Sequence, residues 1–568
     1  MPWLSRFFPF LRWPVPTRED LMSDLRAGLS LGLILVPQAV AYAMLAGMPP
    51  ITGLYASLIP PVLGVLFGSC QLLGAGPVAL TSMLVAGSLI GMAEPESPRW
   101  VFLAIWLALL AGGIQLLMGF LRLGRLVNLL PGTVIAAFTQ AAALLIILSQ
   151  VPTVLGLRLP SGWGWSDLFS VQQWGAWLDW RGLLFGLLTL AFLLGTRRWS
   201  KQFPVVLIGA VVACFISWII GFKSSGGSVV GDLPAGLPEL VVPGLPGYED
   251  FRSLLPAALV IAVVSFVEAL ASAKTISRQR KERWNANQEL IGQGIAKLSG
   301  GFSGAFPVSA SFSRSALNLF VGARTGWSAM VAFVCVLITL LWFTPVLAHL
   351  PRAFLAAVII VPVTNLISPS FFLRLWRLSR PEASIAAATF LATLLAAPQL
   401  QWGILAGFVL ALSYFMFQQA HPRIIEVGAH EDGSLRDRKR FSLSALAPDV
   451  LAVRMDADMS YITSEYLEHF VLDSCRARPE IKRVLLYAGP MNSIDTSGVD
   501  TLRFLITSLR DQGKTVYVAG LKKQVEDVLY HAGLLSLLGG EYVFRTEQSA
   551  IRALTAPPED VTATDEAP

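Results

Sequence analysis

The sequence predicts a polytopic α-helical membrane protein of fourteen spans, followed by a small α/β domain. Of its 568 residues, 54% are hydrophobic and 14% are charged, whereas soluble domains carry about 25% charged residues. The apolar residues fill 21 to about 418, after which charge density rises and strand-like alternation begins. Two short apolar segments also begin at a glycine or a proline inside the apolar region. Such interrupted segments are typical of secondary transporters.

Fourteen apolar segments account for the membrane part. Several are shorter than the ~20 residues of a straight span, and the segment 287–302 is polar enough to be missed by hydropathy alone. The predicted segments are 25–45, 52–69, 77–92, 100–120, 129–149, 182–196, 203–221, 255–276, 287–302, 308–321, 327–348, 353–367, 382–398 and 402–418.

Basic residues alternate between the loops, as the positive-inside rule requires. The loops near 93–99, 150–181, 222–254 and 349–352 carry few of them, whereas the intervening loops are rich in Lys and Arg. The basic residues concerned are Arg122, Arg125, Arg197, Arg198, Lys201, Arg278, Arg280, Lys281, Arg283, Arg324, Arg374, Arg377 and Arg380. If the count were wrong by an odd number of spans, the basic loops would change to the opposite side of the membrane partway along the chain, and they do not. We therefore expect a multi-pass protein of the cell membrane with both termini in the cytoplasm.

A long loop rich in Gly and Pro, 222–254, divides the spans into seven and seven. The short segments 77–92 and 308–321 are each the third span of their half. Segments of this kind at corresponding positions predict two inverted seven-helix repeats. The alternative is that these breaks reflect only the frequent occurrence of Gly and Pro in membrane helices. This alternative is weaker when two such segments stand at matching positions of the two halves.

The two short segments carry the candidate anion site. The N-terminus of a helix attracts anions, and Arg314 adds a planar set of donors suited to oxyanions. Backbone amides and hydroxyls there could replace the hydration shell of an anion, and the alternative for Arg314 is that it points toward lipid headgroups. The candidate residues are Val78, Ala79, Leu80, Ala310, Ser311, Ser313 and Arg314.

The first span adds two polar candidates. Gln38 and Tyr42 are four residues apart, on one helical face. Pro37 frees backbone groups near the middle of the membrane. Gln38 and Tyr42 could line a substrate cavity, or a neighbouring helix could satisfy them.

An acidic residue in the eighth span is a candidate for cation coupling. Glu268 is costly at a helix centre, so it is expected to face the bundle interior and to serve function. Ser272 lies one turn beyond on the same face, and Lys274 follows. Glu268 could carry a coupling proton, and the alternative is a structural ion pair with Lys274 or Arg314.

The sequence resembles the sulfate permease (SulP) family of anion transporters. The resemblance rests on the runs 37–43, 53–56 and 76–79 and on Ser313–Arg314. It implies two inverted seven-helix repeats that form a core and a gate domain, an anion site between the third and tenth helices, and a homodimer. By position, the substrate-site residues are Gln38, Tyr42, Val78, Ser313 and Arg314, and the cation-coupling acid is Glu268.

Departures from the family pattern bear on the substrate. Sodium-coupled bicarbonate members have Asp at Glu268, Thr at Ser272 and Gly-Ala-Thr at 310–312. The resemblance therefore favours a proton-coupled symporter of an inorganic oxyanion, above all sulfate, with elevator-type alternating access. Alternatives are a sodium-coupled bicarbonate carrier, a proton-coupled dicarboxylate carrier, an anion channel or motor, and a membrane-tethered regulator.

The tail alternates strands with helices, which predicts a small α/β domain. The expected strands are 450–455, 483–488 and 514–520, and the expected helices are 464–476, 499–512 and 522–532. The turn 494–499 is similar to the Asp-Ser-Ser-Gly turn of STAS domains, the usual tail of SulP carriers. Thr496 or Ser497 is a possible phosphorylation switch, although helix capping by this turn is favoured.

The remaining features set limits on function. The four cysteines and five histidines show no metal spacing, and there is no Walker motif. We therefore expect no cofactor, no metal, no enzyme activity and no nucleic-acid partner, and the partner of the STAS domain is open. The expected parts are an interfacial segment 1–24, a transport domain 25–420, a cytoplasmic STAS domain 421–555 and a disordered acidic tail 556–568.

Overall fold

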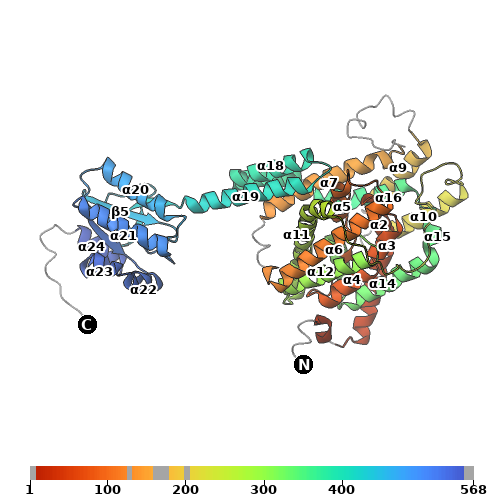
Figure 1. Ribbon diagram of the computed structural model, residues 1–568, viewed down its shortest axis with the longest axis horizontal. Coiled ribbons are helices and arrows are strands. Elements are labelled where there is room, and N and C mark those ends of the chain that lie inside the picture. The colour runs from red at the N-terminus through yellow and green to blue at the C-terminus, as the bar shows by residue number, and fades with distance from the viewer. Residues whose placement is uncertain (1–7, 14, 125–130, 158–177, 197–204, 556–568) are drawn as a thin grey trace. The chain divides into compact units, whose positions relative to one another are not determined.

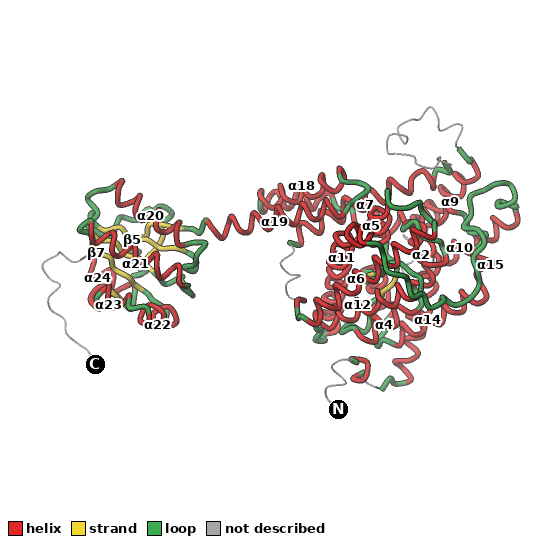
Figure 2. The backbone as a smooth tube through the Cα atoms, viewed as in Figure 1, coloured by secondary structure: helices red, strands yellow, loops and turns green. Residues whose placement is uncertain are grey.

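The computed structural model describes residues 8–13, 15–124, 131–157, 178–196 and 205–555 (Figure 1, Figure 2). It divides into two compact units, Met1–Ala411 and Leu412–Pro568. The expectations for Arg125, for Arg197, Arg198 and Lys201, and for the tail 556–568 fall outside the described residues.

The first unit is helical apart from one short two-stranded sheet. A helix overlaps each of the fourteen predicted segments, and seven helical stretches in the described part are long and apolar enough to cross a membrane. The α-helices are α2 (Arg18–Leu45), α3 (Ile51–Ala56), α4 (Ile59–Phe67), α5 (Ala79–Leu89), α6 (Pro98–Phe120), α7 (Gly132–Val154), α9 (Trp180–Thr196), α10 (Val205–Ile219), α11 (Tyr248–Arg280), α12 (Ala286–Phe302), α13 (Phe312–Val321), α14 (Trp327–Ile338), α15 (Thr344–Leu347), α16 (Arg352–Val363), α17 (Pro369–Leu378), α18 (Arg380–Leu395) and α19 (Gln401–Ala420).

Several helix boundaries differ from the expected ones for identifiable reasons. Helix α2 begins at Arg18 because Thr17 and Asp20 form a capping box there, with each side chain accepting the backbone N–H of the other. The segment 52–69 is two helices, α3 and α4, and Pro60 stands in the first turn of the second one. The amphipathic helix α17 was not predicted.

The two short segments of the prediction are paired by a sheet. Strand β1 (Ala75–Gly76) runs antiparallel to β2 (Ser309–Ala310), with Ala75 opposite Ala310 and Gly76 opposite Ser309. Helix α5 begins three residues after β1, and α13 begins two residues after β2. The pairing therefore brings together two helix N-termini that are more than 230 residues apart in the sequence.

Small residues allow helices α6 and α12 to pack closely. A Cβ atom on Gly112 would lie 2.9 Å from the carbonyl oxygen of Gly294, and one on Gly294 would lie 2.9 Å from that of Gly112. Such contacts are typical of membrane helices that approach through small residues. Because these glycines have no side chain, the backbones of α6 and α12 approach closely along the part of α12 that carries its polar residues.

The second unit is an α/β domain around a six-stranded sheet of order β4-β3-β5-β6-β7-β8. Strands β5 to β8 are parallel, and β3 and β4 are antiparallel additions. One face packs against α20 to α23, and the other packs against α24. The elements are β3 (Ile424–Ala429), β4 (Leu435–Asp437), β5 (Val450–Met455), α20 (Ser464–Ala477), β6 (Arg483–Tyr487), α21 (Thr496–Asp511), β7 (Thr515–Ala519), α22 (Lys523–His531), α23 (Leu534–Leu538), β8 (Val543–Phe544) and α24 (Glu547–Thr555).

The three strands and three helices expected in this unit are all present, within three residues at their ends. The elements β3, β4, β8, α23 and α24 were not predicted. Strands β3, β4 and β8 lie toward the two ends of the sheet, α24 covers its second face, and α23 is a five-residue helix on the first face. Short segments of this kind have weak sequence patterns.

Candidate functional site

The N-terminal ends of the short helices α5 and α13, called the half-helix starts below, are joined by hydrogen bonds through the backbone and one hydroxyl. The N–H of Ser311 donates to the carbonyl oxygen of Gly74 at 2.8 Å. In return, the N–H of Gly74 donates to Ser315 Oγ at 2.9 Å. The first N–H groups of a helix have no intrahelical acceptor and carry partial positive charge. Two such ends therefore lie side by side inside the helical unit.

Arg314 is buried at this junction, with 2% of its surface exposed. Its Nη1 donates to the carbonyl oxygen of Pro77 at 2.8 Å, whereas Nε and Nη2 are buried without a partner among the described residues. The side chain thus turns toward the start of α5, and the alternative in which it reaches lipid headgroups is wrong. Buried guanidinium nitrogens without a protein acceptor are suited to an anion.

Gly76 makes room for this guanidinium. Its φ of +140° is one that residues with a side chain rarely adopt. A Cβ atom at Gly76 would also lie 3.3 Å from Arg314 Nη2. A glycine is therefore required at position 76 both by its backbone conformation and by the close approach of Arg314.

The structure brings most of the other predicted substrate residues to this place. Ala79, Leu80, Ala310 and Ser311 are buried at the helix starts, and Val78 is half-buried. Ser311 caps α13 by accepting the N–H of Arg314 at 3.4 Å. Ser313 is exposed, and its hydroxyl lies 3.2 Å from that of Ser311.

Helix α2 contributes two buried residues of the prediction, Gln38 and Tyr42, which are 8% and 6% exposed. The Tyr42 hydroxyl lies within electrostatic range of both Arg314 and Glu268. Helix α13 packs against both α2 and α11 near the two helix starts.

Glu268 is joined to this region through β2. Ser309 donates from Oγ to Glu268 Oε2 at 2.7 Å, and Ser309 is fully buried. Ser272 donates its hydroxyl to the backbone oxygen of Glu268 at 3.0 Å rather than to the carboxylate. Lys274 lies on an exposed part of α11. Of the three residues predicted for coupling, Glu268 alone has its functional group directed to the paired strands.

Comparison with known proteins assigns the family of the chain. The model of the sulfate permease family matches residues 21–389, and that of the STAS domain matches 445–550. The chloroplastic sulfate transporter 4.1 of Arabidopsis thaliana is 32% identical over 97% of this chain and 83% of its own length. The chain belongs to the sulfate permease family. A probable sulfate transporter of Mycobacterium tuberculosis is 31% identical over 94% of this chain and 96% of its own length.

Solved structures support the fold of this permease. The murine Solute Carrier 26 family member A9 anion transporter, in its inward-facing state, has a TM-score of 0.88 and 22% identity, and the match covers 97% of this chain and 95% of that one. The transmembrane domain of the cyanobacterial bicarbonate transporter BicA has a TM-score of 0.58 and 22% identity over 70% of this chain and 98% of that one. The sulfate permease and STAS matches, together with this fold, make the chain a helical membrane transporter of anions with a C-terminal STAS domain. The relatives are transporters, and none of their names indicates an enzyme.

Sequence reasoning missed Lys297, a buried residue of the permease. It lies on α12, has no exposed surface, and donates from Nζ to Gln115 Oε1 on α6 at 3.0 Å. It also lies within electrostatic range of Glu268. The signal that could have found it is a lysine among small and apolar residues in the segment 287–302.

A second acid on α12, Glu289, was also missed and has a structural role. It is fully buried and accepts the backbone N–H groups of Ser69 and Cys70 at 2.9 and 3.0 Å. Gln293 donates to its other oxygen at 3.1 Å. Its carboxylate is thus satisfied by neutral donors.

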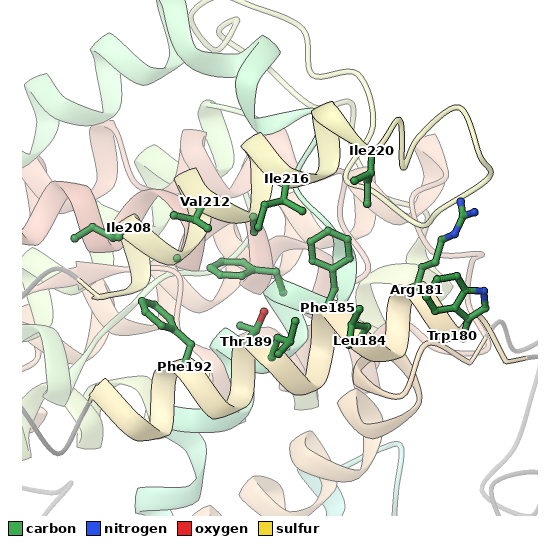
Figure 3. A pocket seen from close by; sticks show the side chains of 14 residues that line it. Trp180, Arg181, Leu184, Phe185, Thr189, Phe192, Ile208, Val212, Ile216 and Ile220 are labelled. Carbon is green, nitrogen blue, oxygen red and sulfur yellow. The ribbon is translucent and has the colours of Figure 1, made fainter.

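A cavity of about 600 Å³ between α9 and α10 contains none of the candidate residues. Phe185, Thr189 and Phe192 project from α9 toward Val212 and Ile216 of α10 (Figure 3). Apart from Arg181 and Thr189, its lining is hydrophobic. Such a cavity does not provide the polar groups that an inorganic oxyanion requires.

The STAS turn places its two hydroxyl residues at the start of α21. The N-cap is Asp495, whose Oδ1 accepts the N–H of Gly498 at 2.8 Å and whose Oδ2 accepts that of Tyr461 at 2.9 Å. Thr496 and Ser497 are exposed. Capping by this turn is confirmed, and Asp495 is the residue that performs it. Phosphorylation of either hydroxyl stays a prediction.

Proposed function

We propose that this permease is a proton-coupled sulfate symporter that works by elevator-type alternating access. The observation that carries the proposal is Arg314, whose Nε and Nη2 are buried beside two helix N-termini and have no partner among the described residues. A tetrahedral oxyanion presents several acceptors to such a set of donors. The substrate contacts proposed here come from the starts of α5 and α13, with Gln38 and Tyr42 on the α2 side.

Glu268 is the proposed proton carrier. It lies within electrostatic range of Arg314 and one hydrogen bond from β2. A carboxylate so close to a bound dianion would repel it, and protonation removes that repulsion. Loading of sulfate would then favour loading of a proton at the same site.

The proposed architecture is fourteen spans in two inverted repeats, with a core domain that moves against a gate domain. The antiparallel pairing of β1 with β2 supports it, because each strand leads into a short helix at the same position of its half. The hydrogen bonds between the two segments would make them move together.

We further propose a homodimer in the cell membrane with both termini in the cytoplasm, and the part boundaries 1–24, 25–420, 421–555 and 556–568. The alternation of basic loops supports the orientation. The STAS unit would bind a regulatory partner whose nature is open. One relative is named as chloroplastic, so fractionation of the host cell is the direct measurement of location.

Uptake of labelled sulfate, bicarbonate and a dicarboxylate into proteoliposomes tests the function. Each anion is offered with an inward proton gradient, a sodium gradient or neither. We expect proton-stimulated sulfate uptake that Arg314→Ala abolishes and that the exposed-residue control Arg26→Ala retains. Glu268→Gln should remove the response to the proton gradient.

Each other result selects a different function. Sodium-stimulated bicarbonate uptake would replace both the substrate and the coupling ion. Proton-stimulated uptake of the dicarboxylate alone would replace the substrate. Currents at channel rates in a planar bilayer would replace the carrier mechanism.

A further inference from the structure

A track of hydrogen bonds that passes through the backbone and the hydroxyl of Ser265 connects Glu268 with Lys297. Ser309 Oγ lies 2.7 Å from Glu268 Oε2 and 3.3 Å from the carbonyl oxygen of Ser265. Gln115 Nε2 donates to Ser265 Oγ at 3.1 Å, and Gln115 Oε1 accepts from Lys297 Nζ at 3.0 Å. The track thus joins α11, β2, α6 and α12 beside the two half-helix starts.

The charges around this track are few and can be counted. Among the described Lys and Arg side chains, two are buried: Lys297 and Arg314. Both lie within electrostatic range of Glu268. Tyr42 is the other titratable side chain that faces Arg314 and Glu268, and Glu289 is satisfied by neutral donors on the other part of α12.

We infer that Lys297 is a specificity-determining residue that matches this site to a dianion. The inference rests on the proposed function and deepens it. Two buried cations balance the two negative charges of sulfate, and Glu268 then requires one proton for the loaded site to be neutral. Without Lys297, the same loaded site would carry one uncompensated negative charge, which is costly to bury.

The position of Lys297 explains why it need not touch the substrate. Its ammonium is held by an amide oxygen rather than by a carboxylate at hydrogen-bond distance. Its charge is therefore not cancelled by a hydrogen-bonded carboxylate, and it influences Glu268 at the other end of the hydrogen-bonded track. The Coulomb energy of a ligand in that field is proportional to the ligand's charge.

Sulfate and perchlorate distinguish charge from shape, because both are tetrahedral oxyanions and perchlorate carries one negative charge. The binding of each is measured by titration of the full-length protein in detergent. In Lys297→Gln, which keeps a donor for Gln115, we expect the sulfate Kd to rise at least tenfold. The perchlorate Kd should rise by no more than about the square root of that factor.

Two further variants ensure that the test does not depend on Lys297→Gln alone. Gln115→Glu places a carboxylate against the ammonium and cancels its charge while Lys297 stays. It also removes the Nε2 donor to the carbonyl oxygen of Ala262 and to Ser265 Oγ, so thermal unfolding accompanies the titration. The same preferential loss of sulfate binding is expected. Lys281→Gln removes an exposed lysine and should leave both affinities unchanged. If Lys297→Gln does not yield folded protein, Gln115→Glu decides the question.

The outcomes separate the two proposals. Equal losses for both anions, or no loss for either, would overturn the role of Lys297 and leave the sulfate site standing. A wild-type protein that binds neither anion would overturn the proposed function, and the inference about Lys297 would fall with it.

Discussion

Arg314 of α13 donates a hydrogen bond from Nη1 to the carbonyl oxygen of Pro77, 2.8 Å away and 237 residues earlier in the chain. Pro77 lies two residues before the first residue of α5 and next to its N-cap, Val78. The residue proposed to bind the anion therefore also fixes the two half-helices to each other. Its position is set by both halves of the membrane unit, so a displacement of either helix would change the site.

Gly76→Ala should damage this arrangement. The substitution combines an unfavourable φ of +140° with a Cβ atom 3.3 Å from Arg314 Nη2. We expect a loss of about 1–3 kcal/mol of stability and at least tenfold weaker sulfate binding, measured by thermal unfolding and by titration. Gly113→Ala is the matched control, because a Cβ at that position of α6 meets nothing within 4 Å. Equal behaviour of the two variants would show that Gly76 is not required.

Asp24→Ala should destabilise the membrane unit. Asp24 is fully buried on α2, and its Oδ1 accepts the backbone N–H groups of Arg324 and Thr325 at 2.7 and 3.1 Å. The Thr325 hydroxyl donates to its other oxygen. Alanine would leave these donors buried without partners, at a cost of about 2–4 kcal/mol.

The control for Asp24 is its neighbour Glu19, which pairs with Arg324 at 3.2 Å but is 79% exposed. An exposed pair contributes about 0–1 kcal/mol, so Glu19→Ala should be nearly neutral in the same thermal unfolding experiment. A loss for Glu19→Ala as large as that for Asp24→Ala would assign the effect to surface charge.

The membrane elements could be predicted because long apolar runs and Gly/Pro breaks are local features of the sequence. The starts of α5 and α13 follow directly from such breaks. Their antiparallel pairing could not be derived from either segment alone, because it depends on a contact across the whole membrane unit. The resemblance to the sulfate permease family supplied that contact.

The site residues likewise divide into those that the sequence could indicate and those that it could not. Arg314 and Glu268 stand out as charges in apolar segments, and the structure places both near the paired strands. Lys297 was missed because other polar residues, among them Glu289 and Gln293, recur between the small and apolar residues of α12. The sequence does not say which of these polar residues faces inward. Ser272 was assigned to the correct face, but its hydroxyl is used by the backbone of its own helix.

Stability of the STAS unit should depend on pH through Asp449. Arg483 donates two hydrogen bonds of 2.8 Å to this carboxylate and holds its pKa below its usual value. A carboxyl with a lowered folded pKa stabilises above its unfolded pKa of about 3.9, and the stability is lost as pH falls through the folded value.

We therefore expect Asp449→Asn to cost about 0.5–1 kcal/mol at pH 7, a modest effect because the pair is partly exposed. In urea unfolding of residues 421–555, the difference from wild type should shrink as the pH falls below about 3.9 and through the lowered folded pKa of Asp449. Asp473→Asn serves as the control, since its ion pair with Arg476 is largely exposed. A difference that persists unchanged at low pH would mean that the ionised carboxylate is not responsible.

The start of α21 offers a test of capping against phosphorylation. Because Asp495 accepts the N–H groups of Gly498 and Tyr461, Asp495→Ala should cost about 0.5–2 kcal/mol in urea unfolding of the STAS unit. Thr496→Ala and Ser497→Ala remove exposed hydroxyls that do not cap the helix, so each should change stability by less than about 0.5 kcal/mol. If the alanine variants of Thr496 or Ser497 alter sulfate uptake by the full-length protein while stability is unchanged, these hydroxyls act in regulation. If they instead unfold the unit as Asp495→Ala does, the hydroxyls are structural and the phosphorylation hypothesis loses its basis.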